Sequence, residues 1–126
     1  MFDTLMDITE RLDFNFNKLE SGSVITKIEV DRLDFIEFCN ELMDSFFLYE
    51  QYLSNTITLI VWLDFDYDSE NTIVDINISN VRMHKSSINN SYVPPALNRI
   101  SERYFSSNYS NQDYINIIED NYTNWF

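Results

Sequence analysis

Glycine is almost absent from this chain. Gly22 is the only glycine among 126 residues, and Pro94 and Pro95 are the only prolines. Turn-rich β-sandwiches and barrels rely on many glycine and proline turns, so the sequence argues against those folds. The same scarcity excludes a glycine-rich phosphate loop, and with it nucleotide binding by a P-loop or a Rossmann turn.

The apolar spacing predicts alternating helices and strands in one domain over residues 1–126. An apolar share of 44% is enough to build a core. In chain order we expect a helix over about 3–13, a strand over about 23–30, a helix over about 31–52, strands over about 56–68 and 72–83, a helix from Pro94-Pro95 and a last helix after Ser110. The predicted class is α+β, with a small antiparallel sheet (a hairpin over about 56–83 plus the strand over about 23–30) packed with about four helices.

The second strand of the hairpin changes phase along its length. Its inward residues are predicted to be Val74, Ile76, Ile78, Val81 and Met83. The first three and the last two differ in parity, which predicts a β-bulge near residues 79–80.

Three of the predicted helices carry recognisable start signals. Asp31 is a suitable N-cap, Pro94-Pro95 suits a first helical turn, and Ser110 with Asp113 fits a capping box. In the helix that follows the prolines, we expect Leu97, Ile100 and Tyr104 to face inward.

The net charge of −13 limits the partners of this protein. Residues 1–75 hold 17 acids against four bases, and the balance reverses over residues 76–110. A chain so charged is repelled by nucleic acid and by anionic membranes, and it is attracted to basic proteins.

The acids recur with the period of the element that carries them. The sets are Asp31, Asp34, Glu37, Glu41 and Asp44 on one predicted helix, Asp3, Asp7, Glu10 and Asp13 on another, and Asp64, Asp66 and Asp68 on a strand, with Glu70 just beyond. Alternate strand residues lie about 6.6–6.8 Å apart on one face, and helical residues three or four apart rise about 4.5–6 Å. Phosphates along a DNA strand have a comparable separation.

Two interpretations of these acids stay open. A solvated helix face is the usual reason for a run of charges. Solvated helices normally mix acids with lysines, however, and two carboxylates about 6 Å apart in water repel by about 0.7 kcal/mol before screening. The shortage of bases favours a recognition surface for a strongly basic partner.

In size and charge the chain resembles the acidic DNA-mimic inhibitors that phages use against restriction or CRISPR nucleases. It is equally similar to acidic immunity proteins that neutralise nuclease toxins. The resemblance covers charge character alone and implies an inhibitor of a nuclease or another nucleic-acid-binding protein. Mimicry by all three sets requires them to share one continuous face.

The alternative prediction is a calcium-binding or structural/interaction protein that uses the loop over Asp64–Asp75. Asp64, Asp66, Asp68, Glu70, Thr72 and Asp75 occupy positions 1, 3, 5, 7, 9 and 12 of an EF-hand-like loop. Ser69 stands where that loop needs glycine, and the flanks are predicted to be strands. We therefore expect no metal and no cofactor.

The remaining reactive residues do not predict an enzyme. His84 is the only histidine and lies in a basic, polar context, without a nucleophile motif beside it. Cys39 is the only cysteine and lies among apolar and acidic residues, which favours a buried thiol over a reactive one.

The start of the chain and the aromatic residues complete the prediction. The acidic residues near Met1 do not fit a signal peptide, and no apolar run reaches membrane-spanning length, so we expect a cytoplasmic protein. Trp62 is predicted on the strand face that carries Asp64. Trp125 and Phe126 fit either the core or a partner contact.

Overall fold

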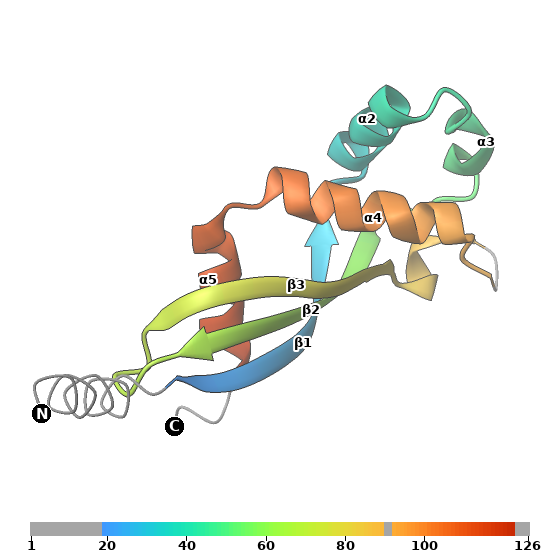
Figure 1. Cartoon of the computed structure of the whole chain (residues 1–126). Coiled ribbons are helices and arrows are strands. Elements are labelled where there is room, and N and C mark those ends of the chain that lie inside the picture. The colour runs from blue at the N-terminus through green and yellow to red at the C-terminus, as the bar shows by residue number, and fades with distance from the viewer. Residues whose placement is uncertain (1–18, 90–91, 123–126) are drawn as a thin grey trace, which may run out of the picture.

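The structure, a computed structural model, describes residues 19–89 and 92–122 (Figure 1). Its sheet has three antiparallel strands in the order β1-β2-β3, which are β1 (Glu20–Val30), β2 (Ile57–Tyr67) and β3 (Ile73–Met83). The described helices are α2 (Arg32–Leu42), α3 (Phe47–Glu50), α4 (Pro95–Asn108) and α5 (Asn111–Asn121), with a short 3-10 helix at Lys85–Ser87. The predicted α+β class, with a hairpin, one further strand and four helices, is confirmed.

The hairpin contains two irregularities where one was predicted. Trp62 pairs with Asn80 while Leu63 pairs with Ile78, so Ser79 is the extra residue of the predicted bulge. A second register shift leaves Val74 unpaired, because Asp66 faces Asp75 and Tyr67 faces Ile73. The prediction that Val74 points inward is therefore wrong: its side chain is 52% exposed, and Ile73 packs against the core instead.

The predicted helix over about 31–52 is also wrong, because the chain forms two helices there. Met43 is extended (φ −145°, ψ 111°) and ends α2. Asp44 and Ser45 follow, and such side chains compete for backbone hydrogen bonds and favour turns. The break brings Phe46 into the core, where it is fully buried.

The two helices after the prolines start as predicted. Pro95 occupies the first turn of α4, where a missing N–H costs no hydrogen bond. At α5, the Ser110 Oγ accepts the Asp113 N–H (3.2 Å) and the Asp113 carboxylate accepts the Ser110 N–H (2.8 Å), which completes the capping box. Leu97, Ile100 and Tyr104 are buried as expected.

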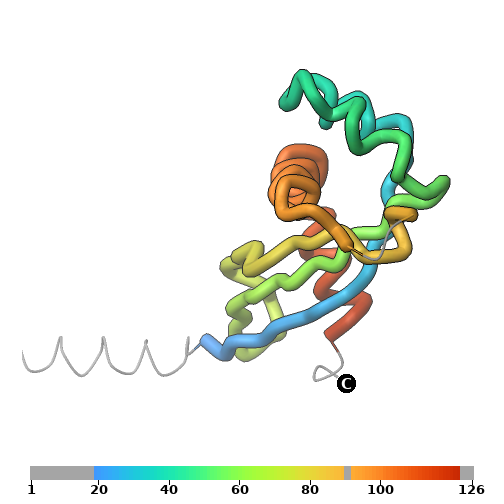
Figure 2. Tube along the Cα trace, turned by 90° about the vertical axis from the view of Figure 1, so that its right-hand side faces the viewer, coloured from blue at the N-terminus to red at the C-terminus, as the bar shows by residue number. Residues whose placement is uncertain are grey.

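The core lies between one face of the sheet and the helices. The inner face of β2 contributes five buried side chains, Ile57, Leu59, Val61, Leu63 and Phe65. Helices α4 and α5 share one hydrophobic cluster with them. Helix α2 packs on α4, where Phe35 and Phe38 contact the Tyr104 ring edge-on at centroid distances of 5.2 and 5.4 Å. Figures 1 and 2 show α4 between the sheet and the α2–α3 pair.

The opposite face of the sheet, here called the outer face, carries the alternate residues of each strand. On β1 these residues are exposed, and the Ile25 side chain is 62% exposed. Trp62 shares the strand face of Asp64, as predicted. It lies opposite Ile25 and is partly buried there. Trp125 and Phe126 lie outside the described residues, and so does the predicted helix over about 3–13. No described helix has the length and apolar character needed to cross a membrane.

Candidate partner-binding surfaces

Three carboxylates lie together on the outer face at the turn end of the hairpin. Strand alternation buries Leu63 and Phe65 on the inner face and turns Asp64 and Asp66 to the outer face. The β2–β3 register then places Asp75 directly opposite Asp66. From the sequence, Asp75 was predicted only as a possible metal ligand, because the periodicity of one strand does not show which residues of another strand lie opposite.

Strand β1 supplies hydroxyl groups to these carboxylates. The Ser21 Oγ donates a hydrogen bond to Asp66 Oδ1, and the Ser23 Oγ donates one to Asp64 Oδ1, both at 2.7 Å. Sequence reasoning missed both serines, although their alternate positions at the start of the strand were a usable signal. An open hollow of about 600 Å³ lies at this end of the sheet. It is lined by Ser21, Gly22, Ser23, Asp64, Phe65, Asp66, Asp75, Asn77 and Tyr122.

Replacing Asp75 with asparagine is expected to stabilise the protein. Like charges directly opposite on a sheet are destabilising, so removal of one should raise the free energy of unfolding by about 0.2–1 kcal/mol. Urea denaturation at low ionic strength measures the gain, and added salt should reduce it. Glu102→Gln, at an exposed acid on α4, is the matched control. An equal gain in both variants would show that only net charge matters.

Asp68 shapes the hairpin turn. Its Oδ1 accepts the backbone N–H groups of Glu70 (2.9 Å) and Thr72 (3.0 Å). Asn71 adopts a left-handed φ of 62°, which asparagine tolerates better than most residues. The predicted row of Asp64, Asp66 and Asp68 therefore divides into two strand residues and one turn residue, with Glu70 exposed at the tip.

The hairpin geometry does not support the alternative calcium loop. Its predicted ligands run up one strand and back along the next, with Asp66 opposite Asp75, and they do not wrap a common centre. Among the residues that the structure describes, no group of three or more His, Cys, Asp or Glu side chains is placed to hold a metal ion.

Calcium is accordingly expected to leave the thermal stability unchanged. A ligand that binds only the folded state raises the melting midpoint by mass action, whereas a chain without a site shows no such shift. Calorimetric melting in excess CaCl₂ and in EDTA, at matched ionic strength, tests this. A midpoint that rises with calcium and falls back with EDTA would contradict the expectation.

The acids of α2 form a second, shorter set. Asp34, Glu37 and Glu41 are exposed and lie opposite the buried side of the helix. Asp31 is the N-cap, and its carboxylate accepts the Asp34 N–H at 3.0 Å. Asp44 lies beyond the end of the helix, so the predicted column of five reduces to three helical residues plus a capping residue.

The only base within this set is engaged by the backbone. Arg32 Nε donates to the Ser54 carbonyl at 3.1 Å, and a second guanidinium nitrogen donates to the Glu50 carbonyl at 3.4 Å. These hydrogen bonds from Arg32 connect the start of α2 to the end of α3 and the residues after it. The acids on the exposed side of α2 therefore have no basic neighbour from their own helix.

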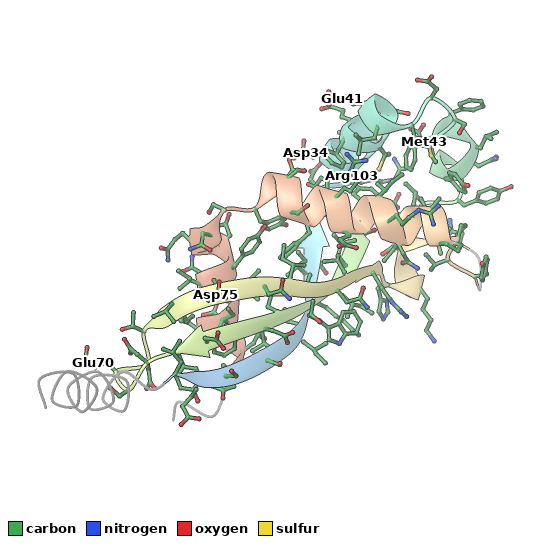
Figure 3. All side chains as sticks on the ribbon, in the orientation of Figure 1. Asp34, Glu41, Met43, Glu70, Asp75 and Arg103 are labelled. Carbon is green, nitrogen blue, oxygen red and sulfur yellow. The ribbon has the colours of Figure 1, made fainter. Side chains whose placement is uncertain are left out.

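The two described acidic sets do not form one continuous surface. Asp34 and Glu41 lie on α2, whereas Glu70 and Asp75 lie at the hairpin end, with α4 and much of the sheet between them (Figure 3). The third predicted set, Asp3, Asp7, Glu10 and Asp13, lies outside the described residues. A single face that combines the α2 and hairpin acids is therefore ruled out.

His84 acts as a cap. Its Nδ1 accepts the Ser86 N–H at 3.1 Å and lies 2.7 Å from the Ser86 Oγ, at the start of the short 3-10 helix. These contacts give the histidine a structural role in the connection between β3 and α4.

Cys39 is a buried thiol, and its burial raises the pKa to about 12 from an ordinary 9.0. We expect native protein at about pH 8 to react with a thiol reagent only through local opening, while the chain in urea reacts at once.

The pKa of this thiol is higher in the folded chain than in the unfolded chain. Its contribution to stability is therefore complete below pH 9 and is lost as the pH rises toward 12. Equal labelling rates in buffer and in urea would contradict the burial of the thiol.

Comparisons of the chain with protein-family models, with curated proteins and with solved structures found no match.

Proposed function

We propose that this protein acts by binding, and that it inhibits a basic, nucleic-acid-processing protein through the hairpin-end acids Asp64, Asp66 and Asp75. The observation that carries the proposal is the direct opposition of Asp66 and Asp75 beside Asp64. Cross-strand and alternate positions on a sheet are separated by about 4.5–7 Å, so the three carboxylates stand at intervals comparable to those of DNA phosphates. A groove that neutralises phosphates with Lys and Arg would accept them.

The local energetics support a role in binding. Opposed carboxylates cost stability, and a sequence selected for folding alone would place Asn or Lys at one of these positions. Features that weaken a fold are typical of functional sites. The Ser21 and Ser23 hydroxyls orient the acids without neutralising them.

Affinity capture from a host lysate with four baits tests the proposal. The native chain is compared with Asp64→Asn/Asp66→Asn/Asp75→Asn, with Asp34→Asn/Glu37→Gln/Glu41→Gln, and with Glu102→Gln/Glu119→Gln/Asp120→Asn as control. Each triple variant removes three negative charges and keeps side-chain size. All three control acids are exposed.

A nuclease or DNA-binding protein held by the native and control baits, and lost from the hairpin variant, is the expected result. Duplex DNA should displace it, and rising salt should weaken its binding steeply. Prey lost only from the α2 variant would move the binding surface to that helix. Prey held equally by all four baits, or insensitive to DNA, would refute mimicry.

A further inference from the structure

The two edges of the sheet differ in how they are protected. Strand β1 pairs with β2 through all 11 of its residues without a register shift. In the described part of the chain, no backbone or side-chain hydrogen bond beyond this ladder reaches the backbone of β1. Helix α5 contacts both β1 and β3, so it crosses the inner face of the sheet and does not run along the β1 edge.

The β3 edge is blocked in three ways. Its strand is interrupted by the extra residues Val74 and Ser79, which break the regular spacing of its outward backbone groups. The Met83 N–H donates to Asn98 Oδ1 of α4 at 3.0 Å. Helix α4 also packs along β3. Sheet proteins commonly shield their edges in such ways, and a long regular edge without them is a template for another strand.

We propose that β1 pairs with β1 of a second copy about a two-fold axis at Ile25, which gives a six-stranded antiparallel sheet across the dimer. Strand pairing between identical edges is isologous, so it closes after two copies. Centring on Ile25 allows all of residues 20–30 to pair, because each end of one strand then meets the opposite end of the other.

The charges of β1 are compatible with this register, which is also the one that pairs the whole strand. With Ile25 at the axis, Lys27 faces Ser23 and Glu29 faces Ser21 of the other copy, so no like charges are directly opposed. A register centred on Lys27 would oppose that residue to itself, which is destabilising. One centred on Ile28 would pair Lys27 with Glu29, but only over residues 26–30, because β1 ends at Val30.

The register also brings the exposed apolar residue of β1 in each copy together on the outer face. Ile25 is 62% exposed in the single chain and pairs with Trp62 of β2. In the dimer the two Ile25 side chains meet at the axis, with a Trp62 beside each. A continuous apolar row then crosses the middle of the joined sheet, and burial of this row favours association.

The proposed dimer does not depend on the proposed inhibitory function, and the two respond differently to salt. Each copy carries a net charge of −13, so screening should strengthen the dimer. Binding of a basic partner should weaken under the same change. The two surfaces therefore respond to salt with opposite signs, and failure of one proposal leaves the other intact.

Sedimentation equilibrium of the full chain tests the proposal at about 0.05 and about 0.5 M NaCl. We expect a monomer–dimer equilibrium with the smaller dissociation constant at the higher salt. Ile25→Lys places two lysines at the axis and should raise that constant about tenfold or more. Val74→Lys is the matched control, because Val74 is a similarly exposed apolar residue on β3, and it should leave the constant within about twofold.

A crosslink reports the register. Opposite residues of an antiparallel pair lie about 4.5–5.5 Å apart at Cα, within disulfide range, so Ile25→Cys should form a covalent dimer under mild oxidation. The buried Cys39 should not form a disulfide between copies. A chain that stays monomeric at both salt concentrations, equal weakening by Ile25→Lys and Val74→Lys, or crosslinking through Ile28→Cys in place of Ile25→Cys would each overturn the proposal.

Discussion

Replacing Phe105 with alanine is expected to lower the free energy of unfolding by about 3–5 kcal/mol. The Phe105 ring is fully buried and packs against Tyr109 and Tyr114 at centroid distances of 4.9 and 5.1 Å. It therefore joins the end of α4 to the start of α5. Truncation removes these contacts and leaves a cavity that rigid neighbours fill only in part.

The control for this prediction is the same substitution at an exposed phenylalanine. Phe47 on α3 is 63% exposed, and Phe47→Ala should change stability by no more than about 0.5 kcal/mol. Urea denaturation of both variants gives the comparison, provided that the slope of the transition is unchanged. A similar loss in both would mean that Phe105 is not part of a packed core.

Gly22→Ala is expected to destabilise the protein by about 1–3 kcal/mol. A Cβ on Gly22 would lie 2.6 Å from Phe65 Cζ and 2.9 Å from a ring carbon of Tyr122. These rings are packed edge to face at a centroid distance of 4.9 Å, so displacement of either ring disturbs its contact with the other. The substitution would push apart the contact that holds α5 to the hairpin end of the sheet.

The sign of the stability change shows whether the steric clash or the unfolded-chain entropy dominates. Gly22 does not adopt a positive φ. Without the clash, alanine should therefore stabilise the folded protein by about 0.4–1 kcal/mol, because it lowers the conformational entropy of the unfolded chain. A double-mutant cycle with Phe65→Leu separates the two contributions, because the smaller side chain should relieve part of the penalty. A gain in stability from Gly22→Ala alone would show that the rings yield freely.

Local signals predicted most of the fold. The alternation of β2 was decisive because its inward residues form an unbroken apolar series from Ile57 to Phe65. The capping box at Ser110 and the proline start of α4 were equally clear, because each involves groups within a few residues. The bulge at Ser79 appeared in the sequence as a change of parity.

The errors arose where tertiary contacts decide between local alternatives. The bulge at Val74 has no parity signal, because either Ile73 or Val74 offers a β-branched side chain to the core. The break after Leu42 depends on burial of Phe46, which periodicity alone does not distinguish from a continued helix.

The candidate site was predicted only in part for the same reason. Asp64 and Asp66 were assigned to one strand face, but their neighbours Asp75, Ser21 and Ser23 come from two other strands. Periodicity indicates which residues share a face of one element. It does not indicate how separate elements are placed, so the separation of the α2 and hairpin acids emerged only from the structure.

The strand order β1-β2-β3 has a consequence for how the chain folds. Only residues 68–72 separate β2 from β3, whereas residues 31–56 separate β1 from β2. Closing the shorter loop costs less conformational entropy, so the hairpin should form early and β1 should join it later, as α2 and α3 settle. The hollow at the hairpin end is completed only in that late step, when the serines reach the carboxylates. Slow docking of β1 would then set the time at which a newly made chain becomes able to bind the proposed partner.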